Sequence, residues 1–470
     1  MDITIFLLKY KFVIAFYLII ILLIYFYRNK FEIQGKIIYL YKTKIGLKFM
    51  DIYSQPLSKK FDVFGSWLFN ISSIITGIAA VLLIVNKFFN FLNETTSIFV
   101  IVFSAFFLIM FLSIVIFRQF RKAGVVGIYI GFIGMVVITI FVLKGFLDLF
   151  LKPNAPAVLS PVIPGVSIPG SPITVPFWYG IIALFVVVLI HEFSHGLLCK
   201  THNIKVKSSG VGMMAILPLA FVEPDENSLK KASSVAQHSM FAAGPFSNIL
   251  TGIIFLLMMV FIFMPMTFSL TEPINGGVML FSVNGTPARD AGIGYENNLL
   301  IPADVLTSYT IADKPSLRGD SSGAYITHFN GVPINDTDSF MKVYKNISIG
   351  KEVTFSNSNK EYHVIPTNRS GSPYLGVNII NLQLKENASK TQFSIYIIIL
   401  EFLVWLNALS FGLGLANLLP LGITDGGRMI HLWLTNKFGK KSESLFLRLT
   451  GLFVVIVIIT VLLPILRAIF

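Results

Sequence analysis

The sequence predicts a polytopic α-helical membrane protein with about eight transmembrane helices and one small β-rich domain inserted between them. Three observations lead to this fold class. Hydrophobic residues make up 54% of the 470 residues and charged residues only 13%, whereas soluble domains carry about 25% charged residues. Apolar runs long enough to cross a bilayer recur along the chain. Residues 272–388 form the only long polar region. We therefore expect the chain to lie in a lipid bilayer.

The first 150 residues are expected to form a membrane region of four spans. A basic segment at 28–64 follows the first span, and its alternating stretch Lys36–Lys42 predicts a small β-hairpin. The net charge of +13 comes with no nucleic-acid motif, so no nucleic-acid partner is expected. The four spans are placed at about 4–27, 66–86, 97–117 and 125–147.

The rest of the chain is expected to hold four more spans. A proline-rich outer loop at 151–176 cannot be helical. The thirteen residues 210–222 are too few to cross a bilayer and predict a re-entrant or membrane-edge segment. The β-rich domain at 272–388 divides the membrane core into two parts, 177–270 and 393–470. The spans of this core are placed at about 177–200, 241–264, from 393 onward, and 449–469.

The distribution of Lys and Arg predicts the orientation in the cell membrane. These residues concentrate in four segments, with eight in 28–64, three in 118–122, five in 200–231 and five in 428–448. Alternating crossings place all four segments on one side, which the positive-inside rule identifies as the cytoplasm. The N- and C-termini and the β-rich domain are then expected outside the cell.

The span at 177–200 ends in the motif HExxH, which predicts a metal site near the cytoplasmic side. His191 and His195 lie four apart, so on a helix both imidazoles reach one metal ion. Glu192 is placed to act as a general base on a water at that metal. A pair of interhelical hydrogen-bonding histidines is the alternative. The single cysteine, Cys199, excludes intramolecular disulfides and is either a further ligand or a small helix residue.

A catalytic zinc usually needs a third protein ligand, and a carboxylate at the same membrane depth is expected. Asp425 ends another span directed toward the cytoplasm and lies in a glycine-rich patch. Asn248 begins a span on the same side. It is either a hydrogen-bond donor to a substrate carbonyl or to the oxyanion, or a helix-packing amide. The other candidate ligands, each more readily explained as an interfacial residue, are Glu223, Asp225, His202 and His238.

These motifs resemble those of the site-2 protease family of intramembrane zinc metalloproteases. The matching residues are His191-Glu-Phe-Ser-His195, Gly244-Pro-x-x-Asn248 and Asn417-x-x-Pro420-x-x-x-x-Asp425-Gly-Gly. The family pattern usually has Leu at position 424 and Pro at 422, where this chain has Thr424 and Gly422. The resemblance implies one Zn²⁺ per chain, transmembrane protein substrates, and substrate-holding roles for Asn248 and Asn417.

The β-rich domain resembles a PDZ domain in two stretches, 286–293 and 323–334. Many members of the family carry such a domain, and the resemblance implies that it binds a substrate chain end or filters substrates.

The function expected from the sequence is regulated intramembrane proteolysis through a zinc-activated water. A helical substrate must unwind locally to expose its backbone, and Ile204, Lys205 and Val206 are expected to pair with the unwound segment as a strand. The alternatives are a zinc- or proton-linked transporter, since intramembrane His, Glu and Asp also mark relays, and a pseudoprotease that binds membrane segments without cleaving them.

Overall fold

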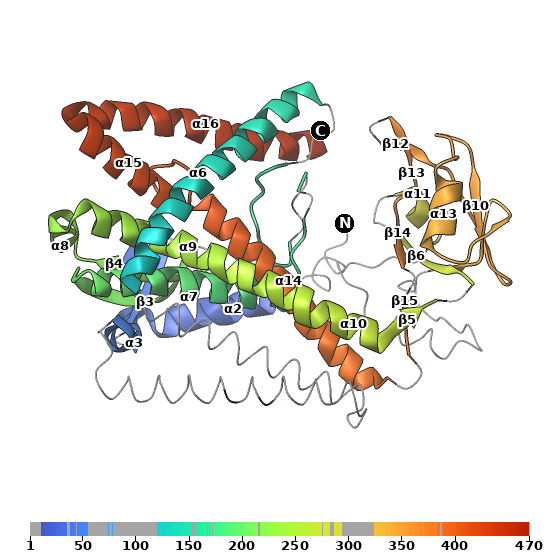
Figure 1. The fold of residues 1–470 in the computed structure, drawn as a ribbon, viewed down its shortest axis with the longest axis horizontal. Helices are drawn as coiled ribbons and strands as arrows, with labels where there is room; N and C mark the ends of the chain where they lie inside the picture. Colours follow the sequence, from blue (N-terminus) through green and yellow to red (C-terminus); the bar gives the residue numbers. More distant parts are fainter. Residues whose placement is uncertain are drawn as a thin grey trace. The chain divides into compact units, whose positions relative to one another are not determined.

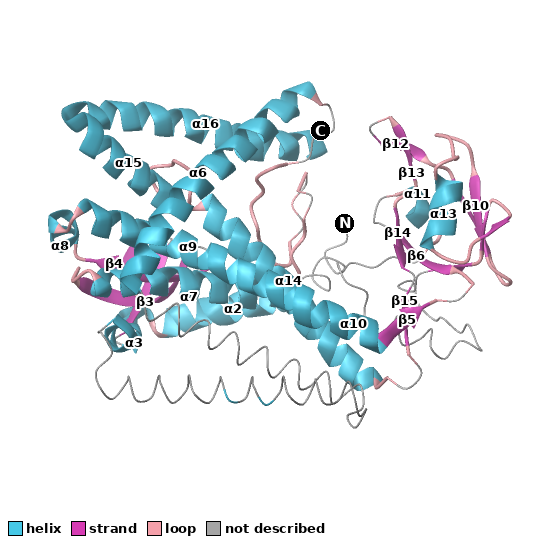
Figure 2. Cartoon of the chain, viewed as in Figure 1, coloured by secondary structure: helices cyan, strands magenta, loops and turns pink. Residues whose placement is uncertain are grey.

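The computed structural model of the chain contains two compact units, one made of Met1–Met259 with Phe402–Phe470 and the other of Val260–Glu401. The first is mainly helical with one β-sheet, and the second contains most of the strands (Figures 1 and 2). The structure describes residues 11–34, 38–43, 45–54, 74, 78, 120–152, 157–293 and 324–469, apart from 167, 169, 172, 215–216, 275, 283–285, 370, 381 and 386–387.

Five helical segments among the described residues are long and apolar enough to cross a membrane, as expected of a multi-pass membrane protein. They are Ala123–Leu151, Phe177–Thr201, Ser234–Leu270, Ile395–Ala416 and Asp425–Arg467. A shorter apolar helix, α2 (Lys11–Phe26), lies where the first span is expected. The spans expected at 66–86 and 97–117 lie outside the described residues, apart from Ile74 and Ile78. The total of eight therefore stays a prediction.

The helices of the first unit pack around α7 and α9. α9 lies against α7, α6 and α15, and α15 also packs on α16. Their bounds are α3 Ile45–Ser54, α6 Phe120–Leu151, α7 Phe177–Thr201, α8 Glu226–Lys231, α9 Ser234–Met258, α15 Asp425–Phe438 and α16 Ser442–Ile469. A further helix, α14 (Lys390–Ala416), begins in the second unit and ends in the first.

A four-stranded antiparallel sheet with the order β1-β2-β3-β4 completes the first unit. The segment expected as re-entrant, 210–222, is largely an antiparallel hairpin of β3 (Val206–Met214) and β4 (Leu217–Pro224). β1 (Glu32–Gln34) and β2 (Ile38–Thr43) form a second hairpin that pairs with β3. The sheet therefore joins the N-terminal region to the membrane core.

β4 and α3 both pack against α7 near the HExxH motif. Gly196 permits this packing, because a Cβ there would lie 2.6 Å from Cε of Met50 on α3. Met50 is buried, and the neighbouring Asp51 forms an ion pair with Lys200 at 2.5 Å. The turn that carries His195 is thus packed against two elements, α3 and β4, from separate parts of the sequence.

The second unit is built from short antiparallel strands around an aromatic core. Phe329, Phe340 and Phe355 are fully buried, and the ring centroid of Phe329 lies 4.9 Å and 4.6 Å from those of the other two. The sheets have the orders β11-β10-β8-β9, β14-β6-β7, β15-β5 and β12-β13. A π-helix at Met259–Phe263 and α10 (Met264–Leu270) lead from α9 into this unit.

The second unit contains thirteen further elements among the described residues. They are β5 Thr271–Pro273, β6 Val278–Ser282, α11 Pro287–Asp290, β7 Ala324–Ile326, β8 His328–Phe329, β9 Val332–Pro333, α13 Thr337–Tyr344, β10 Val353–Ser356, β11 Glu361–Val364, β12 Thr367–Arg369, β13 Ser372–Tyr374, β14 Val377–Ile380 and β15 Leu382–Leu384.

Removing the central aromatic ring should unfold the second unit. We expect Phe329→Ala to cost about 3–5 kcal/mol, because it leaves a cavity in a closed core. Limited proteolysis of the purified full-length chain should then cut faster within 272–388. His328→Ala, on the exposed side of the same strand, is the control and should be cut at the wild-type rate. Equal rates for both variants would contradict this account of the core.

Candidate active site

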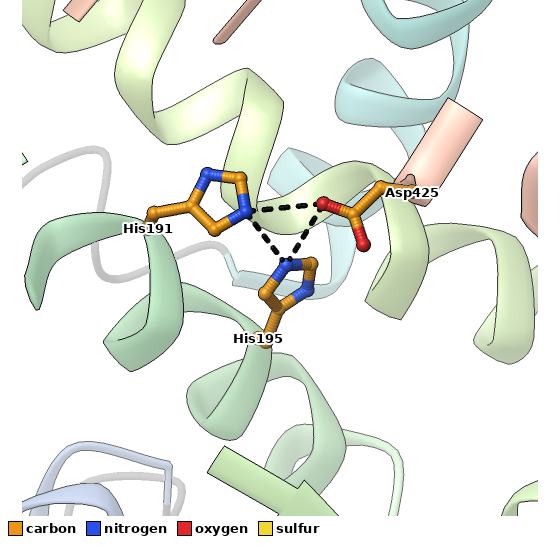
Figure 3. Close-up of side chains that lie close together, drawn as sticks. All are labelled: His191, His195 and Asp425. Carbon is orange, nitrogen blue, oxygen red and sulfur yellow. Dashed lines mark hydrogen bonds and ion pairs between the residues drawn. The ribbon is translucent and has the colours of Figure 1, made fainter. Parts of the chain in front are cut away.

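Two imidazoles and one carboxylate converge in the first unit (Figure 3). Nε2 of His191 lies 3.0 Å from Oδ2 of Asp425, and Nε2 of His195 lies 3.2 Å from the same oxygen. The two Nε2 atoms are 3.2 Å apart. All three residues are buried. The histidines come from one turn of α7, and Asp425 is the first residue of α15.

The hydrogen bonds around this cluster favour a cation at its centre. Nδ1 of His195 lies 2.7 Å from the carbonyl oxygen of Met240, which can only accept, so Nδ1 donates. A neutral His195 therefore presents the lone pair of Nε2 to the cluster. Lone pairs that converge in a buried site repel one another unless a cation lies between them. In a tetrahedral zinc site with Zn–N distances of about 2.0–2.1 Å, two ligand atoms lie about 3.3 Å apart. The three separations in the cluster are close to this value.

The loop before α15 holds the carboxylate in place. Thr424 is the N-cap of this helix, and its hydroxyl accepts a hydrogen bond from the backbone of Gly427 at 3.2 Å. Gly426 donates its N–H to the carbonyl of Asn417 at 2.8 Å. Cβ atoms at Gly426 and Gly427 would collide with the backbone carbonyls of Leu418 and Leu421. The two glycines thus let the loop fold closely over the first turn of α15.

Glu192 lies beside this cluster but is not part of it. Its Oε2 accepts a hydrogen bond from the backbone N–H of Val222 in β4 at 3.1 Å. The side chain is half-buried. A backbone hydrogen bond from β4 therefore holds the carboxylate that follows His191 in the sequence.

Comparison with known proteins agrees with this geometry. The family model of peptidase family M50 matches residues 179–462, a range that includes every residue of the cluster. The chain belongs to peptidase family M50. The members of this family are membrane-bound zinc metalloproteases. The chain is also 26% identical over 330 residues to the uncharacterized protein MJ0971 of Methanocaldococcus jannaschii, with 67% of this chain and 72% of that protein covered.

The other candidate ligands of this M50 protein have different roles. Among the described residues, His191, His195 and Asp425 are the only group whose ligand atoms lie close enough to hold a metal. Asp225 caps α8 by accepting from the N–H of Ser228 at 2.8 Å, and this hydrogen bond holds the pKa of Asp225 below its ordinary value. Glu223 accepts from the hydroxyl of Ser208 at 2.6 Å.

The two remaining histidine candidates and the cysteine also lie apart from the cluster. His238 lies within α9, where its Nδ1 donates to the carbonyl of Ser234 at 2.8 Å. His202 is the C-cap residue of α7. Cys199 is fully buried among apolar side chains, as a small helix residue would be.

The structure places the two asparagines differently. The amide of Asn248 lies 3.1 Å from Nδ1 of His191, on the side of the ring away from Asp425. Asn248 is fully buried. Asn417 contributes its backbone carbonyl to the loop before Asp425, as described above.

Residues 204–206, which are expected to pair with a substrate, have hydrogen-bond partners within the chain. The N–H of Ile204 donates to Cys199, and the N–H of Lys205 donates to the hydroxyl of Ser228. The carbonyl of Lys205 accepts from Asp225. Val206 begins β3, which lies between β2 and β4. These backbone groups are therefore already paired, and the edge nearest Glu192 belongs to β4.

Sequence reasoning missed the part that Gly244 plays. A Cβ at this position would lie 2.5 Å from Nε2 of His191 and closer still to Nε2 of His195. The glycine in Gly244-Pro-x-x-Asn248 thus allows α9 to approach both imidazoles. In the sequence, Gly244 lies four residues before Asn248. This spacing puts Gly244 and Asn248 on one face of a helix and could have indicated the role of the glycine.

Gly244→Ala should weaken zinc binding by at least about tenfold, because the added methyl group displaces both imidazoles from their common centre. Metal content of the purified protein after dialysis against a chelator measures this. Gly412→Ala is the matched control, because a Cβ at that glycine in α14 meets nothing within 4 Å. Full zinc retention in Gly244→Ala would show that α9 does not constrain the ligands.

Proposed function

We propose that this chain is an intramembrane zinc metalloprotease that cleaves transmembrane segments of other membrane proteins. The observation that carries the proposal is the convergence of His191, His195 and Asp425 beside Glu192, at the end of an apolar helix. Membership of peptidase family M50 indicates peptide hydrolysis as the reaction. Two imidazole nitrogens and one carboxylate oxygen are ligands that suit zinc. We further propose one zinc per chain.

The chemistry divides between the metal and the chain. Zinc, when bound, would polarise the scissile carbonyl and lower the pKa of a water. Glu192 takes a proton from the attacking water and passes it to the leaving amine. Hydrolysis then balances, because the water oxygen joins the carbonyl carbon and both water protons end on the products.

The edge of β4 offers a place for an unwound substrate. Backbone groups along a strand point alternately to either side. The N–H of Val222 points to Glu192, so it lies on the side of β4 away from β3. A substrate segment that pairs with this side would lie along the general base. This assignment replaces residues 204–206 as the expected substrate strand.

The surroundings and partners are proposed from the sequence pattern. Transmembrane proteins are the substrates, and the site lies near the cytoplasmic side of the cell membrane. The termini and the β-rich domain lie outside. That domain is proposed to be PDZ-like and to bind a substrate chain end. The two PDZ-like stretches fall largely on α11 and on β7, β8 and β9.

Replacing the general base should separate catalysis from metal binding. We expect Glu192→Gln to lower the cleavage rate of a single-span substrate by about 10²–10⁴-fold, with zinc content unchanged. Asp425→Ala should lose both zinc and cleavage activity, because a proposed zinc ligand is removed. Zinc content and cleavage are measured on the same preparations. Zinc without any cleavage in the wild type would favour a transporter or a pseudoprotease.

Disulfide trapping can test the β4 edge, since the chain has a single, buried cysteine. In the inactive Glu192→Gln background, we expect Val222→Cys to form a disulfide with a cysteine near the cleavage site of the substrate, because paired strands bring Cβ atoms to about 4.5–5.5 Å. Ile33→Cys, on β1 at the opposite edge of the sheet, is the control. Equal trapping at both positions would contradict pairing at β4.

A further inference from the structure

One face of α9 meets the two metal-binding imidazoles at three successive turns. Met240, Gly244 and Asn248 are spaced four residues apart, as are His191 and His195 on α7. Side chains with this spacing lie above one another on a helix. The carbonyl of Met240 contacts Nδ1 of His195, Gly244 lies against both rings, and the amide of Asn248 contacts Nδ1 of His191.

Pro245 lies within α9 and has no N–H to donate to the carbonyl of Phe241. The carbonyl of Met240, one residue earlier, accepts from Nδ1 of His195 at 2.7 Å. The backbone of α9 thus supplies one of the three contacts.

The amide of Asn248 completes the pattern once its orientation is considered. In the orientation with Nδ2 facing Nδ1 of His191, the Oδ1 atom is buried and has no hydrogen-bond partner among the described residues. A half-turn of the amide places Oδ1 at Nδ1 instead. His191 then donates from Nδ1 and keeps the lone pair of Nε2, as His195 does.

The packing around Asn248 holds the amide in position. The residue is fully buried. A Cβ at Gly414 on α14 would lie 3.1 Å from Cβ of Asn248, so this glycine lets α14 pack directly on the asparagine. A buried amide held in this way has few alternative orientations, and each costs a hydrogen bond.

We propose that Asn248 is a positioning residue for zinc, whose Oδ1 accepts the Nδ1 proton of His191 and so directs Nε2 toward the metal. This role rests on the zinc site of the proposed function but not on proteolysis. It differs from the substrate-holding role suggested by the sequence, because it acts before any substrate binds. Outer partners of this kind commonly contribute about 10–100-fold to metal affinity.

The test is the zinc affinity of the purified full-length protein, measured by competition with a chromophoric chelator. We expect Asn248→Ala to bind zinc about 10–100-fold more weakly than wild type. Asn248→Asp keeps an acceptor at Nδ1 and should retain the affinity within a few-fold. Asn407→Ala is the matched control, because Asn407 is also an interhelical asparagine, donating to the carbonyl of Gly252 on α9 at 2.6 Å.

A second readout is the visible absorption of bound Co²⁺, which reports the ligand arrangement without any substrate. The spectrum should change in Asn248→Ala and stay as in wild type in Asn407→Ala. Wild-type zinc affinity in Asn248→Ala would overturn the proposal, even if cleavage were lost. Equal weakening in Asn407→Ala, or no rescue by Asp, would also overturn it. If the wild type binds zinc but cleaves no substrate, only the proposed protease function is contradicted, and the proposed role of Asn248 is not.

Discussion

The central constraint on this structure is the meeting of two imidazoles and one carboxylate inside a bundle of apolar helices. The two Nε2 atoms and Oδ2 of Asp425 lie about as far apart as the ligands of one tetrahedral ion. Burying such a set in an apolar interior is costly unless a positive charge, from a metal ion or a proton, offsets that of the carboxylate. To form it, α7, α9 and α15 must approach closely at one level. Gly244 is small at the position where a side chain on α9 would meet both imidazoles, and Gly426 lets the loop before α15 lie close to its first turn.

The sheet connects this centre to the N-terminal region. β1 and β2 precede the catalytic helix by more than a hundred residues, yet they pair with β3 and so support β4. β4 in turn holds Glu192 through Val222. The segment 28–54, which no metal-binding motif marks, therefore helps to position the proposed general base. α3 supports the same part of α7, because its Met50 packs where Gly196 leaves room.

The sequence could predict what depends on local spacing. His191, Glu192 and His195 follow from helix periodicity, and Asp425 follows from membrane depth together with its glycine-rich neighbours. The edge strand could not be predicted, because the order of strands in a sheet depends on pairing between distant segments. The contact of Asn248 with His191 depends on the register between α7 and α9, which no single segment encodes. The sequence therefore predicts a contact with a substrate for Asn248, whereas the structure shows its contact with His191.

The two departures from the family pattern before Asp425 compensate each other in this structure. Gly422 lacks the ring with which a proline would restrict the loop, so the loop needs another restraint. Thr424 provides it, because its hydroxyl donates to backbone carbonyls of the loop, with Leu419 at 2.5 Å and Leu421 at 2.9 Å, and accepts from Gly427. A leucine at 424 could make none of these bonds. The position of the carboxylate is therefore set here by a hydrogen-bonded cap, and Thr424 and Gly422 are best understood as a pair.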